Sequence, residues 1–147
     1  MRFIDEKGNA IFLGLCGIGK THLATALGYA ACQHGYSVLF ANAIDAINTL
    51  SAAQAQGVLK TQLKRYLSPA LLILDEVGYL PIDQRGADLL FQVISQRYER
   101  GSIVITSNKA FKHGLLSSTA IAPLPPPSSI AFFTTQKLSS SKAQATG

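Results

Sequence analysis

Lys20 and Thr21 close a glycine-rich segment whose spacing is typical of phosphate binding. Residues 14–21 read GLCGIGKT and fit the pattern G-x-x-x-x-G-K-[ST], with an apolar run before them and helical periodicity after them. Glycines let the backbone turn several N–H groups toward one anion, and the first turn of the following helix adds unpaired N–H groups. We therefore expect Lys20 to bind the β- and γ-phosphate oxygens of a nucleoside triphosphate, and the Thr21 hydroxyl to ligate Mg²⁺.

The same segment has a purely structural interpretation. A glycine turn could join a strand to a helix and leave Lys20 on the surface. The agreement of the whole eight-residue string with its strand-before, helix-after context favours phosphate binding. The residues expected to contact the nucleotide are Gly14, Gly17, Ile18, Gly19, Lys20, Thr21 and His22. Of these, we expect His22 to be exposed rather than catalytic.

Two adjacent carboxylates follow a second apolar run. Residues 71–76 read LLILDE, so a buried strand would deliver Asp75 beside the glycine-rich loop, where it can hold the metal through water. Glu76 could polarise a water for attack on the γ-phosphate. Two solvated acids at a strand end are the alternative, but their position after the Lys20 motif favours the functional interpretation.

A polar amide ends a third apolar run. Residues 103–108 read IVITSN, which places Asn108 at the carboxyl edge of a further strand, where open α/β sheets bind ligands. Asn108 would orient water or contact the γ-phosphate, although an asparagine in a turn is the alternative. The candidate catalytic residues are thus Lys20, Glu76 and Asn108, and the candidate metal ligands are Thr21 and Asp75.

The elements that must position these residues alternate along the chain. The predicted strands are the apolar or β-branched runs at residues 10–13, 37–41, 71–75 and 102–106. Four helices are predicted between and after these strands. The first ends at Gly35 and has a buried face formed by Leu23, Leu27, Ala30 and Ala31, and the next two cover residues 44–56 and 59–67. The last runs from the N-cap Asp83 to Gly101, with Ala87, Leu90, Phe91, Ile94 and Tyr98 at helical spacing. This order predicts an α/β fold, with a P-loop-type parallel sheet flanked by helices.

Composition describes one globular domain and excludes several classes. The chain has 147 residues, 48% of them hydrophobic and 14% charged, with a net charge of +5 and two cysteines. No apolar run approaches the roughly 20 residues of a membrane helix, and no signal peptide is recognisable. We therefore expect a cytoplasmic protein with reduced thiols and no membrane partner.

The character of the sequence changes after Lys112. Residues 113–147 contain no acid, are rich in serine and proline, and lose helical periodicity. We expect residues 1–112 to form the P-loop ATPase core and residues 113–147 to be an irregular or disordered tail. Within that tail, SSIAFFTT could supply an edge strand.

With these motifs placed, the chain resembles the ATPase core of the IstB-like transposition helper proteins, relatives of the DnaC-type helicase loaders within the AAA+ class. The matching strings are GIGKTHLATALGYAAC, LLILDEVGYLP, GADLLFQVISQRYERGS and IVITSN, between about residues 3 and 112. The resemblance implies ATP and Mg²⁺ as cofactors, a DNA-associated ATPase, and a role in guiding a transposase to target DNA. It also implies self-association, because an arginine in that family acts in trans on a neighbour's ATP.

The chain departs from the family at three places. Leu15 and Cys16 stand where prolines are common, the family's N-terminal region is missing, and nothing after Lys112 resembles the helix that carries the trans-acting arginine. Arg97 and Arg100 are the available substitutes, but a solvated or structural role is the ordinary expectation for both. Hydrolysis is therefore expected to be slow.

Other functional interpretations remain open at this point. The chain could be a truncated remnant that binds nucleotide or DNA without catalysis, or, with less support, a small-molecule kinase. A DNA patch is conceivable on the short helix that carries Lys60, Lys64 and Arg65, where a solvated face is the alternative.

Overall fold

The computed structural model describes residues 1–14, 19–108 and 130–134 of the chain. The helices are α1 (Arg2–Asp5), α2 (Lys20–Gln33), α3 (Ala43–Ala55), α4 (Leu59–Leu67) and α5 (Gln84–Arg97). The strands are β1 (Asn9–Leu13), β2 (Val38–Asn42), β3 (Leu71–Asp75), β4 (Ser102–Ser107) and β5 (Ile130–Thr134). None of the helices in these ranges is long and apolar enough to cross a bilayer.

The strands form one sheet in the order β2-β3-β4-β1-β5, and every neighbouring pair is parallel. The four strands predicted from apolar runs are confirmed within about two residues at each end. The edge strand expected from SSIAFFTT is confirmed as β5, which pairs with β1. The strands β3 and β4 lie between other strands, and every residue in them is buried.

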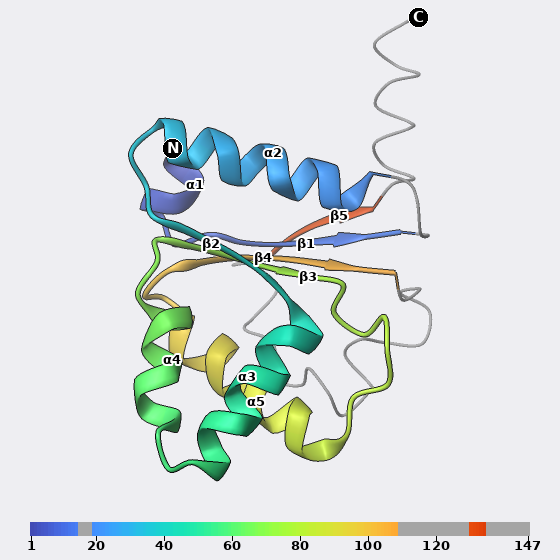
Figure 1. Cartoon of the computed structure of the whole chain (residues 1–147). Coiled ribbons are helices and arrows are strands. Elements are labelled where there is room, and N and C mark those ends of the chain that lie inside the picture. The colour runs from blue at the N-terminus through green and yellow to red at the C-terminus, as the bar shows by residue number, and fades with distance from the viewer. Residues whose placement is uncertain (15–18, 109–129, 135–147) are drawn as a thin grey trace, which may run out of the picture.

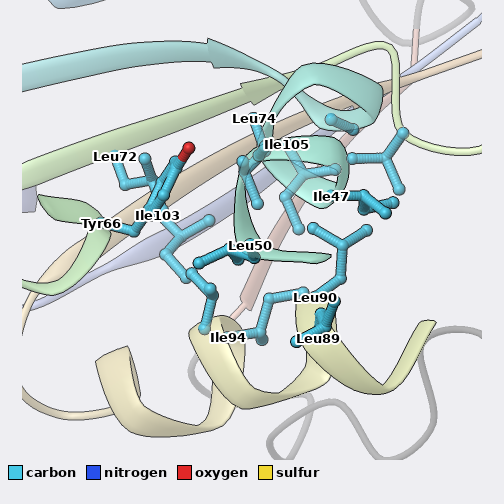
Figure 2. Packing of buried hydrophobic residues seen from close by; sticks show 14 of the residues in the cluster. Ile47, Leu50, Tyr66, Leu72, Leu74, Leu89, Leu90, Ile94, Ile103 and Ile105 are labelled. Carbon is cyan, nitrogen blue, oxygen red and sulfur yellow. The ribbon is translucent and has the colours of Figure 1, made fainter. Parts of the chain in front are cut away.

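The helices cover both faces of the sheet. Figure 1 shows α1 and α2 on one face and α3, α4 and α5 on the other. The larger core cluster lies between the sheet and α3, α4 and α5, where Leu50, Leu90 and Ile94 meet the strand residues Leu72 and Ile103 (Figure 2). A smaller cluster lies under α1 and α2. Burial on both faces explains why the strands read as continuous apolar runs rather than as an alternating pattern.

The buried face of α2 differs from the predicted one. Ala31 is buried as expected, but Leu23 is 42% exposed, and the helix instead packs through Ala24 and Gly28. A Cβ added at Gly28 would lie 2.8 Å from the Ile73 Cδ1 atom. The small residues therefore bring the helix backbone close to the sheet, which a search for large apolar side chains does not detect.

The start of α5 agrees with the prediction. Asp83 is the N-cap, and its side chain accepts a hydrogen bond of 2.7 Å from the Gly86 N–H. Ala87, Leu90 and Ile94 are buried on the predicted face, whereas Phe91 is 37% exposed. The cap and the buried face together direct α5 against the sheet.

Candidate functional site

The predicted site residues gather at the carboxyl edge of the sheet. In Figure 1 the arrowheads of β1, β3 and β4 point to the same end of the sheet, where α2 begins. A cavity of about 280 Å³ opens there. It is lined by Gly19, Lys20, Thr21, His22, Glu76, Tyr79, Thr106, Ser107 and Asn108. Residues from three separate motifs therefore share one cavity, as expected for the ligand end of an open α/β sheet.

The lysine of the glycine-rich segment stands at the first position of α2. Its Nζ atom donates a hydrogen bond of 2.6 Å to the Gly14 carbonyl oxygen at the end of β1. Gly19 is the N-cap with a φ of 90°, a left-handed conformation that glycine adopts without strain. The predicted contacts of Gly17 and Ile18 lie outside the described residues, as does Cys16.

Asp75 connects β3 to the start of α2. The residue is only 6% exposed, and its carboxylate accepts a hydrogen bond from the Thr21 hydroxyl, whose Oγ1 lies 3.0 Å from Oδ1 and 3.2 Å from Oδ2. The Thr106 hydroxyl also donates to Asp75 Oδ1. The two predicted metal ligands are thus in direct contact, although 54 residues separate them along the chain.

The donor atoms at this point fit Mg²⁺. A hydroxyl and a carboxylate are hard oxygen ligands, and Mg²⁺ is commonly bound through one or two such groups together with phosphate oxygens and water. Within the described ranges, no group of three or more His, Cys, Asp or Glu side chains could hold a metal. A cation between Thr21 and Asp75 would therefore need further ligands from phosphate or water.

Glu76 has an unusual backbone and a side-chain partner that the sequence did not predict. Its φ is 60°, which is uncommon for a residue with a side chain. Its Oε2 atom accepts a hydrogen bond of 2.8 Å from Asn42 Nδ2, at the end of β2. The carboxylate is exposed and lies between the main cavity and a second hollow of about 270 Å³ lined by Asn42, Ile44, Asp45, Glu76, Tyr79 and Leu80.

The sequence interpretation missed two residues that contact the acids, Asn42 and Thr106. Both could have been found with the rule that selected Asn108, since each is a polar residue at the carboxyl end of a parallel strand. Asn42 also caps α3, accepting a hydrogen bond of 3.0 Å from the Ile44 N–H. The predicted residues Asn108 and His22 do line the cavity.

Arg97 lies at the opposite edge of the sheet and is fully enclosed. Its guanidinium donates to the carbonyl oxygens of Tyr66, Leu67, Ala70 and Ser102 at 2.9, 3.1, 3.2 and 2.9 Å. The side chain is 1% exposed, and burial lowers the pKa of Arg97 from its usual value to about 10. The structural role weighed for this residue therefore holds, and Arg97 is no substitute for an arginine that acts on nucleotide.

The fold and the edge site together define a class. A parallel sheet of this strand order, with Lys20 and Thr21 opening a helix beside the Asp75 strand end, is the arrangement of an AAA+ P-loop protein. The chain belongs to the family of IstB-like ATP binding proteins, whose model matches residues 1–117.

Relatives of the chain come from insertion sequences. It is 48% identical over 111 residues to a protein of Geobacillus stearothermophilus named for ATP binding and insertion sequence IS5376, covering 76% of this chain and 44% of the relative. It is 44% identical over 111 residues to the similarly named IS21 protein of Pseudomonas aeruginosa, covering 76% and 42%. The chain thus spans less than half the length of these curated relatives.

Solved structures of replication proteins share the fold. The DnaC helicase loader superposes with a TM-score of 0.66 at 28% identity, over 78% of this chain and 69% of that one. DnaA from Aquifex aeolicus, bound to AMPPCP, superposes with a TM-score of 0.65 at 27% identity, over 74% and 36%. The predicted fold class and the family resemblance are both confirmed.

Proposed function

We propose that this chain is the ATP- and Mg²⁺-binding core of a helper protein for insertion-sequence transposition. The observation that carries the proposal is the contact of the Thr21 hydroxyl with Asp75, in a cavity wall that Thr21 shares with Lys20 and Glu76. It joins the phosphate-binding motif to the strand-end acid in three dimensions. The names of the insertion-sequence relatives support the ATP ligand and the biological setting.

The residues of the predicted motifs have separate roles in this proposal. Lys20 exchanges the Gly14 carbonyl for phosphate oxygens, and the first-turn N–H groups of α2 add further donors. Thr21 and Asp75 hold Mg²⁺, which when bound neutralises charge on the phosphates. Glu76 orients a water near the γ-phosphate, and Asn108 contacts the same end of the nucleotide.

Hydrolysis by this chain alone is expected to be slow. No arginine lines the cavity among the residues the structure describes, and Arg97 is bound at the other edge. An arginine acting on the transferred phosphate accelerates P-loop enzymes by roughly 10³–10⁵. Asn42 also holds Glu76 at the border of the second hollow. A neighbouring copy or partner would have to supply the missing charge.

DNA and a transposase are the proposed partners. A DnaA structure with AMPPCP and single-stranded DNA superposes on this chain with a TM-score of 0.65 at 30% identity. The chain carries a net charge of +5, and Lys60, Lys64 and Arg65 are exposed on α4. These features favour DNA contact, with the transposase inferred from the insertion-sequence setting of the relatives.

Nucleotide titration tests the central claim. Fluorescent ATP analogue binding should be at least about tenfold weaker in Lys20→Ala than in wild type, because the only long cation lining the described cavity is removed. Lys60→Ala, on the exposed face of α4, is the matched control and should bind as wild type does. Equal affinity in wild type and Lys20→Ala would refute ATP binding at this site.

A second candidate function is nucleotide or DNA binding without catalysis. The Glu76–Asn42 hydrogen bond favours it, since it engages the carboxylate needed to orient water. ATP turnover measured with and without DNA separates the two. Stimulation by DNA that disappears in Glu76→Gln would rule out the non-catalytic alternative.

A further inference from the structure

We propose that Thr106 is a positioning residue that sets the Asp75 carboxylate for Mg²⁺ and holds Glu76 in place with the same hydroxyl. The inference rests on the proposed function, since it concerns the metal of the ATP site. Thr106 lies near the end of β4, is 1% exposed and borders the cavity. Neither the phosphate-binding pattern nor the paired acids point to it.

The hydroxyl of Thr106 both donates and accepts a hydrogen bond. It donates its single proton to Asp75 Oδ1. Its oxygen accepts the Glu76 backbone N–H at 2.9 Å. A threonine hydroxyl has one proton and two acceptor lone pairs, so this pattern uses its donor and leaves capacity on the oxygen. One side chain therefore connects the proposed metal ligand to the residue proposed to orient water.

The contact with Asp75 limits how the carboxylate can turn. Thr106 on β4 and Thr21 on α2 approach the same oxygen, Oδ1, from two elements. Among the described residues, Oδ2 receives only the longer Thr21 contact of 3.2 Å. Oδ2 therefore keeps acceptor capacity next to Thr21, which lines the cavity, and a metal or its water could use it there. Hydrogen bonds of this kind orient metal-ligating carboxylates and tune their affinity.

The contact with Glu76 stabilises a backbone conformation that glutamate rarely adopts. Glu76 has a φ of 60°, and such residues persist where their surroundings hold them. Besides the Glu76 N–H bond, the Val77 N–H donates to the Thr106 carbonyl at 2.9 Å and Ser107 Oγ donates to the Val77 carbonyl at 2.7 Å. Hydrogen bonds from the end of β4 thus stabilise the turn after β3. Of the groups that make these bonds, the Thr106 hydroxyl is the one that also contacts Asp75.

The Mg²⁺ dependence of nucleotide binding tests this role. It distinguishes a hydroxyl that positions Asp75 for the metal from one that only supplies a hydrogen bond to a buried carboxylate. The full chain is titrated with a fluorescent ATP analogue over a range of Mg²⁺ concentrations and in EDTA. Thr106→Val keeps the side-chain shape without the hydroxyl, and Thr106→Ser keeps the hydroxyl. Ser102→Ala is the control, since it removes a buried hydroxyl from the other end of the same strand.

The expected result is a change in metal dependence alone. Thr106→Val should need about tenfold more Mg²⁺ for half-maximal binding, in the range found when groups that orient metal ligands are removed. Its affinity in EDTA should match wild type, because Lys20 and the start of α2 are unchanged. Thr106→Ser and Ser102→Ala should both show the wild-type Mg²⁺ midpoint.

Several outcomes would overturn the inference while leaving the proposed function standing. One is a wild-type Mg²⁺ midpoint in Thr106→Val, and another is equal loss of binding in EDTA and in Mg²⁺. If Thr106→Val does not fold by circular dichroism, Thr106→Ala takes its place. Loss of fold in both would assign the hydroxyl to folding instead. A wild-type chain that binds no ATP, or binds it regardless of Mg²⁺, would remove the proposed function and this inference together.

Discussion

The two edges of the sheet treat a buried charge in opposite ways. At the amino edge, the Arg97 guanidinium is bound by four backbone carbonyls and is closed off from solvent. At the carboxyl edge, the buried Asp75 is bound by the side chains of Thr21 and Thr106, beside an open cavity that the exposed Glu76 also lines. The side chains beside the cavity can exchange partners when a ligand arrives, whereas the enclosed Arg97 guanidinium cannot reach a ligand in solvent. The first edge is therefore structural and the second is suited to binding.

The largest expected effect is a difference in ATP turnover between variants of two glutamates, one at each edge of the sheet, that share a backbone conformation. Glu76 and Glu99 both have positive φ, at 60° and 62°, and Glu99 follows α5 on the Arg97 side of the sheet. Glu76→Gln should lower ATP turnover by about 10²–10⁴-fold with nucleotide affinity retained, because the amide cannot act as a base. Glu99→Gln should leave steady-state turnover unchanged. Equal turnover in the two variants would remove Glu76 from the mechanism.

The next effect concerns folding rather than catalysis. Arg97→Met should lower the free energy of unfolding by about 3 kcal/mol or more, because several buried carbonyls lose a charged donor together. Chemical denaturation measures the change. Arg100→Met, three residues on and exposed, should stay within about 0.5 kcal/mol of wild type. A small loss in Arg97→Met would contradict the structural role of the amino edge.

A smaller effect tests how tightly the guanidinium is held. A Cβ at Gly101 would lie 2.4 Å from Arg97 Nη2, so Gly101→Ala should cost about 1–3 kcal/mol of unfolding free energy through overpacking. In the Arg97→Met background the same change should cost less, since the flexible methionine can yield. Additive effects in the double variant, measured by denaturation, would show that the two residues do not interact.

The smallest effect concerns the hydrogen bond between Asn42 and Glu76. Asn42→Asp keeps an N-cap oxygen for α3 but replaces the amide donor by a second carboxylate, which frees Glu76. Turnover should rise by about threefold, the equivalent of a weak hydrogen bond. Asp45→Asn, which changes charge beside the same hollow, is the control. Unchanged turnover in Asn42→Asp would show that this bond does not restrain Glu76.

Much of the fold and part of the site could be predicted because local features encode them. The apolar runs in β3 and β4 predicted buried strands, and Asp83 predicted the start of α5. The prediction of the buried face of α2 was partly wrong, because Gly28 permits close packing against the sheet without an apolar side chain that would indicate it. The proposed roles of Asn108 and Glu76 stay predictions, although both residues line the cavity.

By itself, the sequence determined which residues stand at the strand ends and that a lysine and a threonine open the helix after β1. Parallel strands place their carboxyl ends at one edge, so this much follows from order along the chain. Only the tertiary structure decided the partners. The register that pairs Asn42 with Asp75, and Leu74 with Ile105, brings Asn42 to Glu76 and Thr106 to Asp75. The tertiary structure also encloses Arg97, by bringing four backbone carbonyls to its guanidinium. Contacts between strands depend on sheet order and register, and strands that are buried at every residue, as β3 and β4 are, have no alternating pattern that would specify their register.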